Sequence, residues 1–124
     1  MARILVVDDH PHIVRLVRKE LEGDAHEVLT APDGEEALRI ARDEHPAVVV
    51  LDVVMPRRNG FEVLRELKSD PATRDIVVIM LTVKDKEAEF THGLNLGADW
   101  YLPKPFIPGD IAALVRRFLD SPSG

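Results

Sequence analysis

The sequence has no cysteine, no long apolar run and no excess of basic residues, and each absence excludes a class of protein. Without cysteine, the chain forms no disulfide and uses no thiol as a nucleophile or metal ligand, which fits a reducing compartment. The longest apolar run, Ile76 to Leu81, is far shorter than the roughly 20 residues that a transmembrane helix needs. A net charge of −6 disfavours binding to nucleic acid or to an anionic membrane. We therefore expect a cytoplasmic protein that contacts neither.

The remaining composition is typical of one globular domain. The chain has 124 residues, of which 45% are hydrophobic and 31% are charged, and this length is sufficient to bury a core. The sequence contains no internal repeat, low-complexity segment or linker before Ser121. We expect a single domain over residues 1–120 and a disordered tail over residues 121–124.

Short apolar runs alternate with helical patterns along the chain. The runs at residues 3–7, 47–51 and 76–81 are nearly continuous and rich in Val and Ile, which is typical of strands covered on both faces of a parallel sheet. Weaker runs at residues 27–30 and 100–103 predict two further strands. Apolar residues at helical spacing predict five helices, which begin near Pro11, Asp33, Gly60, Ala88 and Asp110.

The alternation of strands and helices predicts an α/β fold with a known binding edge. Parallel strands joined by right-handed crossovers place helices on both faces of the sheet. We expect the flavodoxin-like (βα)5 doubly wound arrangement, with a five-stranded parallel sheet in the order 2-1-3-4-5. Ligands of this topology bind beyond the carboxyl ends of the strands, at the gap between the first and third strands.

Four of the five predicted strands end beside a polar residue. Asp8 and Asp9 follow the first strand, Asp52 follows the third, Thr82 follows the fourth and Lys104 follows the fifth. Because the carboxyl ends of parallel strands lie at one edge of the sheet, we expect these side chains to share one crevice.

The expected cluster has the chemistry of a phosphoryl-transfer site. Three carboxylates repel one another unless a divalent cation lies between them. We interpret the five histidines, including His10 beside the site, as surface residues without metal-binding spacing, so oxygen ligands remain and favour Mg²⁺. Thr82 and Lys104 can neutralise phosphoryl oxygens during in-line transfer, and Asp52 is the natural nucleophile.

The motifs at these strand ends occur in the order and spacing of one family. The chain resembles the receiver domain of a two-component response regulator over residues 2–119, nearly its whole length. The matching motifs are residues 4–9, residues 51–56 with Gly60, residues 81–82, residues 97–99 and residues 104–106.

The resemblance implies a role for each candidate residue. Asp52 would accept a phosphoryl group from a histidine kinase or a histidine phosphotransfer protein. Asp9, Asp52 and the backbone carbonyl of Val54 would bind Mg²⁺ directly, and Asp8 would act largely through water. Thr82 and Lys104 would hold the phosphoryl oxygens.

The resemblance also implies a conformational switch. Movement of Thr82 toward the phosphoryl group would let Tyr101 turn inward and would reshape the face formed by the fourth helix, fifth strand and fifth helix, which regulates a downstream effector protein. The peptide bond between Lys104 and Pro105 would be cis. Such a protein catalyses only its own phosphorylation and dephosphorylation, so we do not expect an enzyme that turns over a substrate.

Several alternatives follow from the same residues. We favour a stand-alone receiver because no effector domain follows in this sequence, but a receiver excised from a multidomain regulator would look the same. A pseudo-receiver that is never phosphorylated is a further alternative, because Val83 is bulkier than the residue usual there in the family. An aspartate-dependent phosphatase needs an acid at the position of Val54, which argues against such an enzyme. Asp8 and Asp9 would repel the phosphate of a bound cofactor, which argues against a flavodoxin-like cofactor-binding protein. The sequence leaves the oligomeric state, the kinase, the input signal and the target open.

Overall fold

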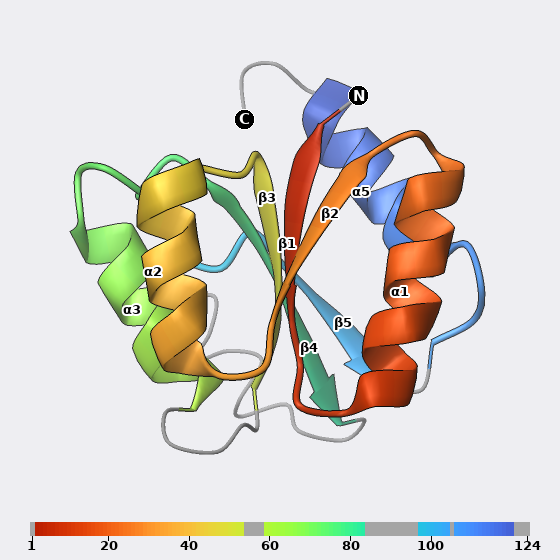
Figure 1. Cartoon of the computed structure of the whole chain (residues 1–124), viewed down its shortest axis with the longest axis horizontal. Coiled ribbons are helices and arrows are strands. Elements are labelled where there is room, and N and C mark those ends of the chain that lie inside the picture. The colour runs from red at the N-terminus through yellow and green to blue at the C-terminus, as the bar shows by residue number, and fades with distance from the viewer. Residues whose placement is uncertain (1, 54–58, 84–96, 105, 121–124) are drawn as a thin grey trace.

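Five parallel strands form one sheet in the order β2-β1-β3-β4-β5 (Figure 1). This computed structural model describes residues 2–53, 59–83, 97–104 and 106–120. The predicted strand order is confirmed. The strands are β1 (Arg3–Val7), β2 (Glu27–Ala31), β3 (Val48–Asp52), β4 (Val77–Val83) and β5 (Trp100–Lys104).

Helices cover both faces of this sheet. Figure 1 shows α2 and α3 together on one face and α1 and α5 together on the other. The predicted helix near Ala88 and the predicted tail at residues 121–124 lie outside the described residues. The described helices are α1 (Pro11–Gly23), α2 (Gly34–Glu44), α3 (Gly60–Ser69) and α5 (Asp110–Asp120).

Local residues at the starts of α1, α2 and α3 explain why these helices begin where the sequence predicts. Pro11 occupies the first turn of α1, where its missing N–H is not needed. The side chain of Asp33 accepts a hydrogen bond from the Glu36 N–H at 3.0 Å, as expected for a capping box. Asn59 accepts from the Glu62 N–H at 3.0 Å and caps α3 in the same way.

Alternate residues of the central strands pack against opposite helix layers. Leu5 and Val49 belong to the core beneath α2 and α3, whereas Ile4 and Val50 belong to the core beneath α1 and α5. All four side chains are fully buried. The nearly continuous apolar runs in the sequence therefore reflect burial on both faces of the sheet.

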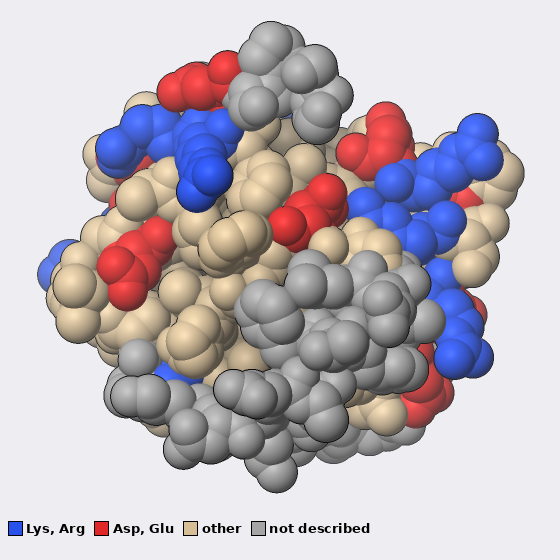
Figure 2. Space-filling view, turned by 180° about the vertical axis from the view of Figure 1, so that it is seen from behind, with Lys and Arg blue, Asp and Glu red and all other residues tan. Residues whose placement is uncertain are grey.

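Charged groups of both signs are scattered over the surface. In the view of Figure 2, acidic and basic side chains lie close to one another, and basic side chains gather along the right-hand side with acidic ones beside them. Several of these charges pair, as Arg3 does with Glu27 at 2.7 Å and Arg39 with Glu36 at 2.6 Å. None of the helices in the described ranges has the length and apolarity that membrane crossing would require.

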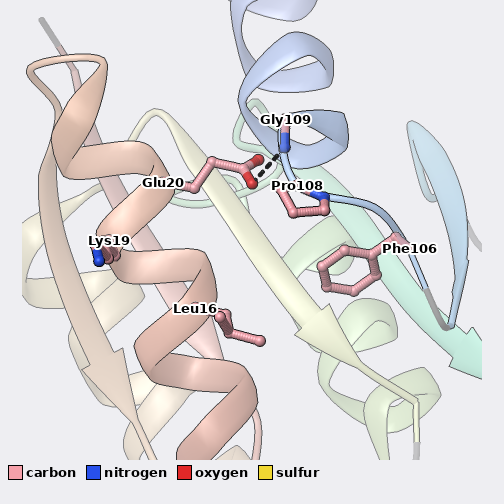
Figure 3. A pocket seen from close by; sticks show the side chains of 6 residues that line it. All are labelled: Leu16, Lys19, Glu20, Phe106, Pro108 and Gly109. Carbon is pink, nitrogen blue, oxygen red and sulfur yellow. Dashed lines mark hydrogen bonds between the residues drawn. The ribbon is translucent and has the colours of Figure 1, made fainter.

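One charged side chain joins the two helices on the same face. The carboxylate of Glu20, on α1, accepts hydrogen bonds from the backbone N–H groups of Gly109 at 2.6 Å and Ala112 at 2.7 Å. Figure 3 shows Glu20 reaching from α1 to the start of α5. Glu20, Leu16 and Phe106 line a hollow of about 340 Å³ at this place. Because free N–H groups at a helix start carry partial positive charge, the carboxylate caps α5 from a neighbouring helix.

Removal of this cap is expected to destabilise the fold. We expect Glu20→Ala to lower the free energy of unfolding by about 1–2 kcal/mol, the range found for loss of a helix cap. Urea unfolding followed by circular dichroism measures the change. The matched control is Glu22→Ala, which removes only an exposed pair with Arg18 on the same helix and should lower it by about 0.5 kcal/mol or less. Equal losses in the two variants would show that Glu20 does not hold α5.

Candidate functional site

The register between β1 and β3 brings two aspartates together. Val7 pairs with Leu51 across these parallel strands, so Asp8 and Asp52 follow at the same level of the sheet. Both carboxylates are almost fully buried, with residue exposures of 2% and 4%. Two acids buried side by side require a nearby positive charge.

The next two strands bring the predicted hydroxyl and ammonium groups to the same edge. Asp52 pairs in register with Leu81 on β4, so that Thr82 lies one residue further toward the carboxyl end. Thr82 is 6% exposed. Lys104 pairs with Val83 and ends β5. The structure therefore places Asp8, Asp52, Thr82 and Lys104 at one edge of the sheet, as the sequence predicts.

Lys104 supplies the positive charge that the buried acids need. Its Nζ lies 3.0 Å from Asp8 Oδ2 and 3.4 Å from Asp52 Oδ1. The Lys104 side chain is only 18% exposed, so water screens these attractions weakly. The ammonium group of Lys104, at the end of β5, thus bridges the acids at the ends of β1 and β3.

The ionisation of Asp8 follows from its surroundings. Burial by itself raises the pKa of this carboxyl group, but hydrogen bonds from the His10 backbone N–H and from Lys104 outweigh that effect and hold the pKa below its ordinary value. Asp8 is therefore a carboxylate at neutral pH, and its oxygens are available as acceptors or as ligands.

His10 is a member of this cluster that the sequence interpretation missed. Its Nδ1 lies 2.9 Å from Asp8 Oδ1 and 3.3 Å from Asp9 Oδ1. The hydrogen bond with Asp8 and the charges of Asp8 and Asp9 raise the pKa of His10. The predicted surface position is confirmed, since the side chain is half-exposed, but the ring also faces the two acids, a contact that the sequence interpretation did not include. Its place directly after Asp8-Asp9 and before the helix-starting Pro11 was the available signal.

The donor atoms of this cluster fit a divalent cation. Asp8, Asp9, His10 and Asp52 each offer one ligand atom, and these four atoms all lie within 4.8 Å of one another. Asp9 and His10 are exposed, whereas Asp8 and Asp52 are buried, so the group opens to solvent on one side. Two further predictions, the Val54 carbonyl ligand and the cis peptide bond at Pro105, concern positions outside the described residues.

The two aromatic residues at the start of β5 face opposite sides of the sheet. Tyr101 is 2% exposed, and its ring centre lies 6.5 Å from that of Phe61 on α3. Trp100 is 40% exposed, and the Arg117 guanidinium lies 5.8 Å from its ring centre. Successive side chains of a strand point to opposite faces of the sheet, and Tyr101 takes the buried, inward position.

Comparison with known proteins identifies relatives over most of the chain. A family model described as the response regulator receiver domain matches residues 4–116. The chain is 44% identical over 117 residues to the alkaline phosphatase synthesis transcriptional regulatory protein PhoP of Bacillus subtilis, and the match covers 94% of this chain and 48% of PhoP. The chain thus spans about half the length of the curated relatives that it matches.

Solved structures agree with the sequence comparison. A putative response regulator from Chloroflexus aurantiacus is 30% identical with a TM-score of 0.91, over 95% of this chain and 97% of that chain. The BeF3-activated receiver domain of DrrB, from Thermotoga maritima, is 37% identical with a TM-score of 0.88, over 97% and 98% of the two chains. With the fold, the strand-end residues and these matches in agreement, the chain belongs to the receiver-domain family of response regulators.

Proposed function

We propose that this chain is a phosphoacceptor switch in which Asp52 receives a phosphoryl group from a histidine kinase or a histidine phosphotransfer protein. The observation that carries the proposal is the bridging position of Lys104, whose ammonium lies beside both Asp8 and Asp52. An ammonium group held next to a buried carboxylate can stabilise charge on a phosphoryl group attached to that carboxylate. The BeF3-activated relative DrrB supports the same assignment.

In the proposed step, an Asp52 carboxylate oxygen forms a bond to phosphorus while the nitrogen–phosphorus bond of the phosphohistidine donor breaks. The leaving imidazole takes up a proton, so no general base on this chain is required. Thr82, one residue beyond the level of Asp52 on the adjacent strand, donates its hydroxyl to a phosphoryl oxygen. Lys104 holds a second oxygen.

Asp8, Asp9 and Asp52 would hold the divalent cation, which we take to be Mg²⁺. The family resemblance implies the Val54 carbonyl, outside the described residues, as a further ligand. When bound, the cation neutralises charge that develops on the phosphoryl oxygens. Without it, the carboxylates of this cluster repel an incoming phosphoryl group. The chain catalyses only its own phosphorylation and dephosphorylation.

Phosphorylation would be read at the face that includes β5 and α5. In our proposal Thr82 and Tyr101 form the switch, and Tyr101 is already buried in the structure. The effector is a separate protein or a further domain of a longer regulator, and the half-length match to transcriptional regulators favours the second form. Because its phosphoryl groups derive from ATP-dependent kinases, we place this chain in the cytoplasm.

Phosphorylation by a small donor tests this function. After incubation with acetyl phosphate and Mg²⁺, intact mass spectrometry should show one added phosphoryl group, which is absent when EDTA replaces Mg²⁺ and in Asp52→Asn. Asp43→Asn, which changes an exposed aspartate on α2, is the matched control and should be labelled like the wild type. Labelling of Asp52→Asn would exclude Asp52 as acceptor, and an unlabelled wild type would favour the pseudo-receiver.

A further inference from the structure

We propose that His10 supplies a nitrogen ligand to the divalent cation held by Asp8, Asp9 and Asp52. The site would then bind the later first-row cations Co²⁺, Ni²⁺ and Zn²⁺ more tightly than three carboxylates alone would. This inference rests on the proposed function, since it concerns the same cation site, but it adds a ligand and a metal preference.

The geometry allows one ion to contact all four residues. Ligand bonds of roughly 2.1–2.2 Å place opposite ligand atoms about 4.3 Å apart across an ion. The four available atoms lie within 4.8 Å of one another, so adjustments of a few tenths of an ångström close the site. His10 Nδ1 is the ring atom that faces the acids, at 2.9 Å from Asp8 Oδ1 and 3.3 Å from Asp9 Oδ1.

The backbone holds His10 at this place. Its N–H donates to Asp8 Oδ1 at 2.9 Å, and its carbonyl accepts from the N–H groups of Ile13 and Val14, both at 3.1 Å. His10 is the N-cap residue of α1, yet its side chain makes no capping hydrogen bond. In this structure Nδ1 donates its hydrogen to the Asp8 carboxylate. To bind an ion, Nδ1 would give up that hydrogen, and the neutral ring would keep its hydrogen on Nε2.

The chemistry of imidazole sets the direction of the preference. Mg²⁺ favours oxygen ligands and retains bound water, so a ring nitrogen adds little to its binding. Co²⁺, Ni²⁺ and Zn²⁺ bind imidazole well. Sites with mixed nitrogen and oxygen ligands generally bind Ni²⁺ more tightly than Co²⁺. His10 should consequently change the affinity for these cations much more than it changes the affinity for Mg²⁺.

Isothermal titration calorimetry of the full chain with CoCl2 and with MgCl2 tests whether His10 strengthens Co²⁺ binding more than Mg²⁺ binding. We expect His10→Ala to weaken Co²⁺ binding about tenfold, and to change Mg²⁺ binding about twofold or less because Mg²⁺ gains little from a nitrogen ligand. The matched control is His12→Ala, an exposed histidine whose ring centre lies 5.9 Å from that of His10. It should leave both affinities unchanged. Equal Co²⁺ affinity in the wild type and His10→Ala, or an equal loss for both cations, would overturn the proposal.

A spectroscopic measurement on the wild type does not depend on the folding of a variant. Pulsed electron paramagnetic resonance of bound Mn²⁺ detects nitrogen that is directly coordinated, and labelling of histidine with ¹⁵N should alter that signal. Absence of a histidine nitrogen signal would contradict the ligand assignment. If that signal is absent but Mg²⁺ still supports labelling of Asp52, the proposed function stands and only the role of His10 fails. If neither Mn²⁺ nor Mg²⁺ binds, the cation site itself fails.

Discussion

Replacement of Gly60 by alanine is expected to lower the free energy of unfolding by about 3 kcal/mol, the upper part of the range for overpacked positions. A Cβ atom at Gly60 would overlap the carbonyl oxygen of Asp52 and lie 2.8 Å from the Cα of Val53. Both obstacles are backbone atoms, so no side chain can rotate away. The Gly60 N–H also donates to the Val53 carbonyl at 2.7 Å, which holds the two segments together.

The same substitution should impair phosphorylation, because the carbonyl oxygen that it displaces belongs to Asp52, the proposed phosphoacceptor. Asp52 ends β3, and Gly60 begins α3 directly against it. We expect Gly60→Ala to be labelled by acetyl phosphate more slowly than the wild type even at temperatures where it remains folded. Circular dichroism fixes that temperature, and intact mass measured over time gives the rate.

Gly23→Ala is the matched control for the glycine experiment. A Cβ atom at Gly23, the last residue of α1, would meet nothing within 4 Å. This variant should match the wild type or gain up to about 1 kcal/mol, since alanine restricts the unfolded chain. A Gly60→Ala protein as stable as Gly23→Ala would show that α3 can retreat from Asp52, contrary to the tight contact described above.

We also expect Lys104→Met to lower the free energy of unfolding strongly when divalent cations are absent. This variant keeps most of the apolar stem but removes the ammonium that lies beside Asp8 and Asp52. Removing one partner of a buried ion pair costs about 3 kcal/mol or more, because the remaining charge stays buried without its counter-charge. We expect a loss of about that size in urea unfolding of the metal-free protein.

Mg²⁺ distinguishes an electrostatic loss from a packing loss. The cation should raise the stability of Lys104→Met more than it raises that of the wild type, because the variant has more uncompensated negative charge. Lys19→Met, at an exposed position on α1, is the matched control and should change stability by about 0.5 kcal/mol or less. A Lys104→Met protein that responds to Mg²⁺ no more than the wild type would mean that Lys104 does not balance the acids.

The sheet was predictable from the sequence because its signals are local and repeated. Runs of Val and Ile marked the central strands, and Asp33 marked the start of α2 through its side-chain cap. The topology rule for parallel sheets then brought Asp8, Asp52 and Lys104 together although up to 96 residues separate them. Their distances could not be predicted, since these depend on the register and twist of the strands.

The sequence did not reveal contacts that join separate helices and strands, or contacts that a tight turn creates. No local sequence pattern marks Glu20, and only the packing of α1 against α5 shows what it caps. His10 has none of the usual spacing between metal ligands, because it reaches Asp8 through a turn of two residues. The steric need for glycine at position 60 depends equally on the approach of α3 to the end of β3.

The most direct test of the central claim is to identify the residue that carries the phosphoryl group. Reduction of an aspartyl phosphate with borohydride converts that aspartate to homoserine, which tandem mass spectrometry can locate in a digest of the labelled protein. The arrangement of Lys104 and the acids around the end of β3 predicts homoserine at position 52 alone. Homoserine at position 8 or 9, or a labelled protein that yields none, would contradict it.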